Sequence, residues 1–242
     1  MEQKAIDYIK KYEPPEGYFV GFSGGKDSIV TLDLVRRAGV KHRSFYSNTL
    51  IDPPEVVSYI KEEYPDVIIL RPRMTFWQGM MRFGVPIRQT RWCCDLLKKD
   101  PARKIPEKQR IFGIRAEESI RRRARGKMVG YKNQIHHHPL FEWNSGDVWD
   151  YIRKYSLRYC KLYDEGFTRI GCMVCPFITR HEYQKYKQKW PHIYRLLEMY
   201  LRRIWERDKV MLQSKYYFTM AEYLQWPLWR SKKERIKEWL QL

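Results

Sequence analysis

Residues 17–28 read GYFVGFSGGKDS, an apolar run that passes directly into a loop of glycines and polar residues. The run at residues 17–22 is short, apolar and bounded by glycine, which is typical of a buried strand. Residues 28–38 then carry apolar side chains at helical spacing and end at Gly39, a common helix stop. A glycine-rich loop between a strand and a helix predicts a phosphate site, because helix N-termini attract anions.

The segments that follow alternate between strand-like and helix-like patterns. The expected strands are residues 41–47, 67–70 and 109–114, and the expected helices are residues 54–63 and 75–83. This alternation predicts an α/β fold of the Rossmann-like kind, with a mostly parallel, twisted sheet flanked by helices. Ligands of such sheets bind at the carboxyl ends of the strands, which is where the glycine loop is placed.

The second half of the chain changes character. Residues 115–132 are densely charged and interrupted by glycine, so we expect a mobile basic loop there. A helix capped by Asn144 and Ser145 should follow, and the pattern after Pro176 is helical and gives a C-terminal appendage. We therefore expect a nucleotide-binding domain with the cysteines at residues 1–180, and a helical, aromatic and basic extension at residues 181–242.

The composition favours a polyanionic partner. The chain has 242 residues, with 47 basic and 28 acidic side chains and a formal net charge of +19. Nucleic acid is attracted by such an excess, although a lysine-rich soluble surface is the competing interpretation. No run of about 18 apolar residues is present, and residues 1–17 lack the apolar core of a signal peptide. We expect a soluble, cytoplasmic protein with no membrane association.

The loop itself narrows the nucleotide chemistry. It fits neither the Walker pattern nor the dinucleotide pattern. Its glycines allow backbone N–H groups to close around an anion, and Asp27 adds a carboxylate for Mg²⁺. The sequence SGGKDS resembles the PP-loop of the ATP pyrophosphatase, or adenine nucleotide alpha-hydrolase-like, superfamily. That resemblance implies ATP with Mg²⁺, attack on the α-phosphorus, pyrophosphate as the leaving group, and nucleotide binding by Ser23, Gly24, Gly25, Lys26, Asp27 and Ser28.

Later motifs resemble the phosphoadenosine-phosphosulfate reductase family over roughly residues 17–180. They are RWCC at residues 91–94, an Arg-x-x-Glu-Ser-x-x-Arg pattern at residues 115–122, PLxxW at residues 139–143, and LYxxGFxRxGCxxCP at residues 162–176. The usual Asp-Thr-Gly is absent from the segment NTLIDPPE at residues 48–55. The resemblance implies Lys26, Asp27 and Arg115 as catalytic residues, and further nucleotide contacts from Asn48, Arg115, Glu118, Ser119 and Arg122.

The cysteines point to sulfur or metal chemistry. An adjacent pair followed by a Cys-x-x-Cys resembles the 4Fe–4S ligand set of the iron–sulfur branch of this family, here Cys93, Cys94, Cys172 and Cys175. Four thiolates also suit a zinc ion, and inert core cysteines are the third interpretation. Arg91, Lys98 and Arg169 would compensate the negative charge of a cluster. Cys160 is expected to be a buried small side chain, with a sulfur-relay thiol as the alternative.

Two further groups of residues leave alternatives open. His136, His137 and His138 are consecutive, so they cannot all face one way in a strand, which disfavours a common metal site. Trp226, Trp229 and Trp239 either stack on nucleic-acid bases or pack a small helical core.

Reductases of the family attack sulfur with a C-terminal cysteine, and no cysteine follows Cys175 here. The chain therefore resembles the sulfur-inserting branches, which are the DNA phosphorothioation ATP pyrophosphatases and the cluster-bearing tRNA thiolases. We expect an enzyme that adenylylates a nucleic acid, DNA more than tRNA, for sulfur incorporation. A sulfur-donor protein such as a cysteine desulfurase is the expected partner. The chain could also form a homodimer. The alternatives are a sulfonucleotide reductase (adenylyl sulfate or phosphoadenylyl sulfate) with an external thiol, and a non-enzymatic nucleotide sensor.

Overall fold

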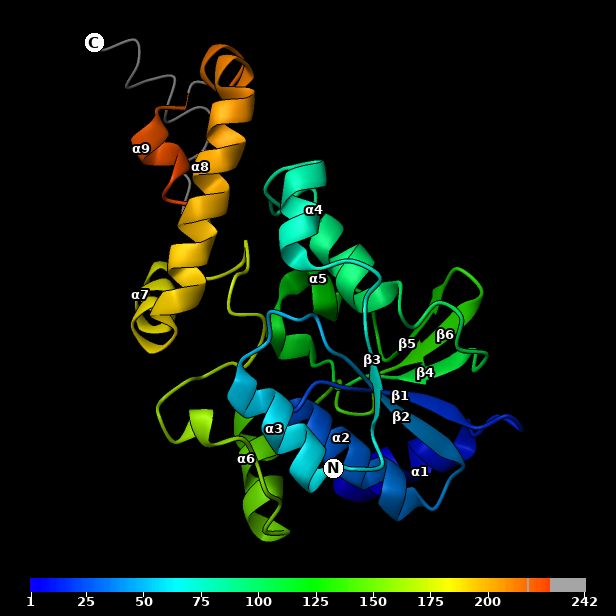
Figure 1. Cartoon of the computed structure of the whole chain (residues 1–242). Helices are drawn as coiled ribbons and strands as arrows, with labels where there is room; N and C mark the ends of the chain where they lie inside the picture. The colour runs from blue at the N-terminus through cyan, green and yellow to red at the C-terminus, as the bar shows by residue number, and fades with distance from the viewer. Residues whose placement is uncertain (217, 227–242) are drawn as a thin grey trace. The chain divides into compact units, whose positions relative to one another are not determined.

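The computed structural model describes residues 1–216 and 218–226, which include a six-stranded sheet (Figure 1). The strand order is β3-β2-β1-β4-β6-β5, and every neighbouring pair is parallel except β5 and β6. The sheet is flanked by helices, and further helices follow the last strand along the chain, so the predicted fold class is confirmed. The strands are β1 Tyr18–Phe22, β2 His42–Ser47, β3 Ile68–Leu70, β4 Gln109–Ile111, β5 Met128–Tyr131 and β6 Gln134–His137.

The chain forms two compact units. Unit 1 consists of Met1–Asn48, Asp52–Arg71 and Asp100–Gly171 and contains the sheet, together with helices α1 Glu2–Lys11, α2 Lys26–Ala38, α3 Pro54–Glu63, α5 Ile120–Arg123 and α6 Ser145–Lys154. Unit 2 consists of Thr49–Ile51, Pro72–Lys99 and the described residues from 172 onward, with α4 Phe76–Phe83, α7 Arg180–Lys189, α8 Pro191–Ser214 and α9 Met220–Tyr223. The boundary expected near residue 180 stays a prediction.

Strand β1 is buried on both faces. On one face Phe19 stacks on Phe45 of β2, with ring centroids 4.6 Å apart. On the other face Phe22 packs against Tyr64, also with centroids 4.6 Å apart. Burial on both sides explains why the strand reads as a continuous apolar run instead of an alternating one. It also fixes the strand end from which the glycine loop departs.

The turn from β1 into α2 requires glycine at one position. Gly24 has a φ of +70°, in the left-handed region. A Cβ atom on Gly24 would lie 3.0 Å from Ile60 and 3.2 Å from Val56, both on α3. Helices α2 and α3 connect strands that step one way across the sheet, so right-handed connections place both helices on one face. Helix α2 begins at Lys26, two residues before the predicted start.

Residues 115–132 do not form the basic loop that we expected. They contain a 3₁₀ turn at Ala116–Glu118, helix α5 and strand β5, which pairs antiparallel with β6. A two-residue turn joins β5 to β6, and Lys132 in it has a φ of +55°. Because β5 lies at the sheet edge, the charged side chain of Lys132 in the turn stays in water while the β5 backbone forms hydrogen bonds. Charge density alone therefore gave the wrong prediction.

Unit 2 is built from helices α4, α7, α8 and α9, and α4 and α7 both pack on α8. Trp226 is 1% exposed, and its indole Nε1 donates to the carbonyl of Pro86 at 2.9 Å. Trp226 therefore packs in a helical core, which was one of the two interpretations for the tryptophans. Trp229 and Trp239 lie outside the described residues. Within the part of the chain that the structure describes, no helix combines the length and apolar character needed to cross a membrane.

The three histidines at the end of β6 make separate contacts, as expected from their alternation. The two ring nitrogens of His137 lie 3.0 Å from the Tyr8 hydroxyl and 2.7 Å from Gln109 Oε1, and His138 Nδ1 lies 3.0 Å from the Gly126 carbonyl. Since Gln109 Oε1 only accepts, His137 donates from Nε2 and accepts at Nδ1, which is the neutral ring. Burial, with a smaller effect of His138, lowers the pKa of His137 to about 4.

This lowered pKa makes the stability of the fold pH-dependent. His137 titrates near pH 6.5 when unfolded and near pH 4 when folded, so below pH 6.5 the unfolded chain binds the extra proton. Stability due to His137 is therefore present above pH 6.5 and is lost as the pH falls towards 4. Between pH 7 and pH 5, we expect the free energy of unfolding, measured by urea denaturation, to fall by about 1–2 kcal/mol less in His137→Gln than in the wild type. The exposed His192→Gln is the control, and equal losses in all three proteins would contradict the prediction.

Candidate functional site

The loop between β1 and α2 is shaped by its own hydroxyl groups. Ser28 Oγ donates to the Gly25 carbonyl at 2.8 Å and accepts from the Ser23 backbone N–H at 3.2 Å. The Ser23 hydroxyl donates to Ser28 Oγ at 3.2 Å and accepts from the Gly25 N–H at 3.4 Å. The predicted binding residues Ser23, Gly25 and Ser28 therefore form one hydrogen-bonded turn around Gly24.

The first amide of helix α2 has a protein partner. The Lys26 N–H donates to the Tyr163 hydroxyl at 2.9 Å. Tyr163 packs edge-on against Trp149, with ring centroids 5.1 Å apart, which fixes its ring. A free N–H at a helix start is the group that binds a phosphate oxygen, so Tyr163 stands where an anion contact is expected. The sequence reasoning did not assign Tyr163 to the site, although it belongs to the Leu-Tyr motif at residues 162–163.

Asp27 joins two cations at the carboxyl end of the sheet. Its Oδ1 accepts from Arg115 Nε at 2.5 Å, and its Oδ2 pairs with Lys26 Nζ at 3.3 Å. Lys26 is 8% exposed and Arg115 is 5% exposed. Burial alone would lower the pKa of Arg115, but its contacts with Glu117 and Asp27 outweigh burial and raise the pKa. The structure thus brings together the three residues that we predicted as catalytic.

Gly113 permits this contact between β4 and α2. A Cβ atom at this position would lie 2.7 Å from the Asp27 carbonyl oxygen and 2.8 Å from Thr31 Oγ1. The Thr31 hydroxyl donates to the same carbonyl at 2.7 Å, so the first turn of α2 cannot move aside freely. The backbone after β4 therefore runs against α2, and Arg115 follows two residues later within reach of Asp27.

The other predicted residues of this segment extend the network. Glu118 Oε2 accepts from the Arg115 backbone N–H at 2.9 Å and pairs with Arg122. Ser119 caps α5, because its Oγ accepts from the Arg122 N–H at 3.2 Å. Helix α5 is thereby tied to the loop through Glu118 and Arg115. Three more basic side chains of this segment are exposed and form no ion pair with the described residues. They are Arg121 and Arg123 of α5 and Arg125 just after it.

Asn48 follows β2 directly and is 9% exposed. Its backbone N–H donates to the Leu70 carbonyl at the end of β3, at 3.0 Å. Because β1 and β2 are parallel neighbours, Asn48 lies at the same edge of the sheet as the glycine loop. Its predicted nucleotide contact fits this place and stays a prediction.

The four predicted ligand cysteines all belong to unit 2. Arg88 Nε donates to the Pro176 carbonyl at 2.9 Å, and the Arg91 guanidinium lies 5.1 Å from the centre of the Phe177 ring. These contacts hold the segment of Cys93 and Cys94 beside the segment of Cys172 and Cys175. The Thr49 hydroxyl lies 3.5 Å from Cys172 Sγ, and the Met173 N–H donates to the Ile51 carbonyl at 2.9 Å.

The thiols of these segments influence one another. The hydrogen bond between Cys93 and Cys94, then burial, then the charges of Cys94, Cys172 and Cys175 raise the pKa of Cys93. The same hydrogen bond and the charges of Lys98, Arg91 and Lys99 lower the pKa of Cys94 to about 6. All four sulfurs therefore lie in one electrostatic neighbourhood with cations around it. Arg169 belongs to unit 1, and Cys160 is 1% exposed, as the small-core interpretation predicts.

The described residues contain no group of three or more His, Cys, Asp or Glu side chains placed to hold one metal ion. A zinc ion requires its four sulfurs close together, since each Zn–S bond is about 2.3 Å. An iron–sulfur cluster is larger, and its cysteine ligands stand farther apart around it. The four thiols belong to one unit and have cationic side chains near them, which is donor chemistry that suits either group.

Known proteins match the chain in sequence and fold. The sequence model of the phosphoadenosine phosphosulfate reductase domain matches residues 17–177. Two uncharacterized proteins of Methanocaldococcus jannaschii are 34% and 28% identical over 86% and 87% of this chain. Those matches cover 47% and 55% of the relatives, so the chain spans about half the length of these two proteins.

A curated enzyme and a solved structure point the same way. The adenosine 5'-phosphosulfate reductase of Geobacillus thermodenitrificans is 31% identical over 63% of this chain and 70% of that protein. The crystal structure of a phosphoadenylyl-sulfate reductase from Candida auris, a phosphate complex, has the same fold, with a TM-score of 0.55 at 18% identity. That comparison covers 71% of this chain and 87% of the other. With its glycine loop and the domain match over residues 17–177, the chain belongs to the phosphoadenosine phosphosulfate reductase domain family.

Proposed function

We propose that the protein is an ATP pyrophosphatase that adenylylates a nucleic acid as a step in sulfur incorporation. The observation that carries this proposal is that the segment linked to the PP-loop has two groups of arginines, one held in ion pairs and one exposed. Arg115 and Arg122 are held in a network that begins at Asp27, while Arg121, Arg123 and Arg125 are exposed and carry unneutralised charge beside it. The first kind serves the bound nucleotide, and the second kind offers contacts for the phosphates of an acceptor.

The PP-loop supplies the means of nucleotide activation. Lys26 and Arg115 place two basic side chains in a largely buried setting, where a positive charge stabilises a phosphate more than it does in water. An acceptor oxygen attacks the α-phosphorus, the new P–O bond forms, and the bond to the bridging oxygen breaks. Pyrophosphate leaves with the electron pair, held by the loop. A Mg²⁺ contact from Asp27 requires that the carboxylate exchange Lys26 or Arg115 for the ion.

The adenylylated oxygen is then a good leaving group. A sulfur nucleophile displaces it, so that a bond to sulfur forms and AMP departs with the oxygen. In this proposal a sulfur-donor protein, such as a cysteine desulfurase, provides the sulfur. Cys93, Cys94, Cys172 and Cys175 would hold a 4Fe–4S cluster, with zinc as the less favoured occupant. Such a cluster supplies a site for sulfur and for electrons.

The choice of acceptor rests on charge and on resemblance. A net charge of +19 exceeds what a nucleotide substrate requires, and the exposed arginines of residues 121–125 place part of it at the loop. DNA is preferred to tRNA because of the resemblance to DNA phosphorothioation enzymes.

A second candidate is supported by the named relatives. Several curated relatives are called adenosine 5'-phosphosulfate reductase, at 27–31% identity. In this alternative the PP-loop site binds adenylyl sulfate and an external thiolate attacks its sulfur, so that AMP leaves with the bridging oxygen. A second thiolate then attacks the sulfur of the first thiol, a disulfide forms, and sulfite is released. The two candidates differ in their products, which are pyrophosphate and an adenylylated acceptor in one case and sulfite in the other.

The loop lysine gives the direct test. Purified protein is supplied with Mg²⁺-ATP and either DNA, tRNA or no acceptor, and pyrophosphate is measured. We expect release that depends on DNA and that falls roughly 100-fold or more in Lys26→Ala, because the charge on the leaving phosphates is lost. Lys61→Ala, which removes an exposed lysine from α3, should match the wild type. Release of sulfite from adenylyl sulfate with thioredoxin, without any acceptor-dependent pyrophosphate, would favour the reductase instead.

The exposed arginines predict a salt-dependent acceptor contact. Replacing Arg121, Arg123 and Arg125 together by Gln should lower the slope of log affinity against log salt by about 2–3 for duplex DNA, since each lost phosphate contact contributes about 0.9. The KM for ATP should stay unchanged. The matched control replaces the exposed Lys4, Lys10 and Lys61 by Gln. An equal slope for both triple variants would show that residues 121–125 do not contact the acceptor.

The cysteine set predicts the cofactor content. Protein prepared without oxygen should contain about four iron atoms per chain with the brown absorbance of a cluster. Cys93→Ser and Cys172→Ser should each lose this absorbance, whereas Cys160→Ala, outside the set, should keep it. One zinc ion per chain and no iron in the same preparation would overturn the assignment.

A further inference from the structure

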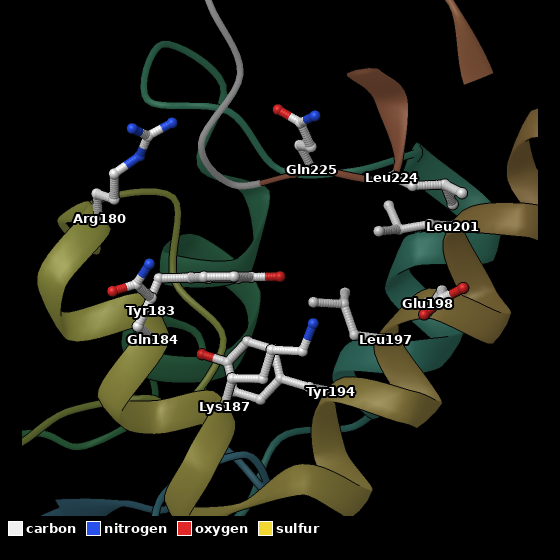
Figure 2. Close-up of a pocket in the computed structure, with 10 residues that line it drawn as sticks. All are labelled: Arg180, Tyr183, Gln184, Lys187, Tyr194, Leu197, Glu198, Leu201, Leu224 and Gln225. Atoms are coloured by element: carbon white, nitrogen blue, oxygen red, sulfur yellow. The ribbon is translucent and has the colours of Figure 1, made fainter. Parts of the chain in front are cut away.

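A pocket of about 500 Å³ lies within unit 2 between α7, α8 and the residues after α9 (Figure 2). It is separate from the PP-loop, all of whose residues belong to unit 1. Its volume falls in the range of small-ligand pockets, roughly 300–1,000 Å³. Its lining includes two cations, aromatic rings, apolar walls and amide groups, among them Arg180, Tyr183, Lys187, Leu197, Leu201 and Gln225.

Helix α7 contributes the charged side of this pocket. Arg180, Tyr183 and Lys187 are spaced at i, i+3 and i+7, so they lie on one face of the helix. Arg180 and Lys187 start about 10 Å apart along the helix axis. Neither forms an ion pair with any residue that the structure describes. In Figure 2 Arg180 lies at the edge of the pocket and the Lys187 amine points inward.

The aromatic side of the pocket is held in place. Tyr194 is 5% exposed, and its hydroxyl donates to the Met173 carbonyl at 2.9 Å. Tyr183 stands perpendicular to it, with ring centroids 5.1 Å apart and an interplanar angle of 89°. This edge-to-face contact fixes the Tyr183 ring without covering both of its faces. The Tyr183 hydroxyl has no hydrogen-bond partner in the described part of the chain, and Figure 2 shows the side chain reaching across the pocket.

The balance of charge in the pocket is positive. Glu198 also lines it, but its carboxylate is paired with Arg202 on the next turn of α8 at 2.6 Å. Arg180 and Lys187 therefore keep unneutralised charge at the pocket. Leu197 and Leu201 provide an apolar wall opposite α7. A ligand that suits this lining has a flat aromatic part, polar edges and a nearby negative charge.

We infer that this pocket binds one unpaired nucleotide of the nucleic-acid acceptor, an inference that rests on the proposed function. The base packs on Tyr183 and the leucine wall, and the amides of Gln184 and Gln225 lie within the lining for its polar edges. The flanking phosphates pair with Arg180 and Lys187. An acidic peptide would satisfy the two cations and leave the aromatic and apolar surface unused. A nucleotide within a duplex is stacked and cannot enter the pocket, so the acceptor is engaged at a single-stranded or opened position.

The test measures binding of a fluorescein-labelled single-stranded DNA 12-mer by anisotropy. The same oligomer with abasic sites and the same sequence as a duplex are the two reference probes. We expect Tyr183→Ala to bind the intact single strand roughly 5- to 100-fold more weakly, because one stacked base is lost. Tyr183→Phe, which keeps the ring, should stay within about twofold of the wild type, since stacking does not need the hydroxyl. Binding of the abasic oligomer should be the same for all three proteins.

The charged side is tested in the same assay. Arg180→Gln combined with Lys187→Gln should lower the salt slope for single-stranded DNA by about 1.4, from about 0.7 for each phosphate. Arg195→Gln removes an exposed arginine of α8 outside the pocket and should leave the slope unchanged. The inference would be overturned if Tyr183→Ala bound the intact oligomer with the same affinity as the wild type does. Equal competition by an acidic peptide of matched charge would also overturn it.

The outcomes separate this inference from the proposed function. If the wild type releases pyrophosphate in response to DNA while Tyr183→Ala binds DNA as tightly as the wild type, the pocket does not bind a nucleotide and the proposed function stands. If the base-dependent loss appears but no acceptor supports pyrophosphate release, the pocket stands and the function is wrong.

Discussion

The carboxylate of Asp27 is the contact on which the rest of the nucleotide site depends. It lies in the first turn of α2, and it holds Lys26 from its own loop and Arg115 from the segment after β4. Two buried cations at one place would repel each other and lose hydration, so Lys26 depends on this carboxylate, which Arg115 shares in addition to Glu117. The same carboxylate ties β4 to α2 and, through Arg115 and Glu118, orients helix α5. One acidic side chain thus connects the nucleotide loop to the basic surface beside it.

The local parts of the site could be predicted from the sequence. The passage from β1 through the glycine loop into α2 depends on short-range patterns, and the helix that the sequence predicts over residues 54–63 has the bounds of α3, Pro54–Glu63. The contact between Asp27 and Arg115 spans 88 residues of chain and depends on the parallel pairing of β1 with β4. The resemblance to a family supplied both residues, but composition and periodicity carry no information about such a contact.

Other features were missed for definable reasons. The hairpin of β5 and β6 is an edge element, and its high charge concealed a regular backbone pairing that needs no apolar core. Tyr163 was part of a recognised motif, yet nothing in the sequence indicates that its hydroxyl reaches the Lys26 amide 137 residues away. The meeting of the cysteine segments depends on Arg88 and Phe177, whose packing is likewise a tertiary property.

The hydrogen bond from the Lys26 amide to Tyr163 has a thermodynamic consequence for nucleotide turnover. A phosphate oxygen that takes this amide displaces an existing partner, so binding exchanges one hydrogen bond for another. The exchange limits the free energy gained from this donor and leaves charge, from Lys26 and Arg115, as the main source of affinity for the ligand. When such a phosphate group departs, the hydroxyl can return and satisfy the amide, which lowers the cost of emptying the site. The Lys26 amide therefore has a hydrogen-bond partner both when the site is empty and when it holds a phosphate group.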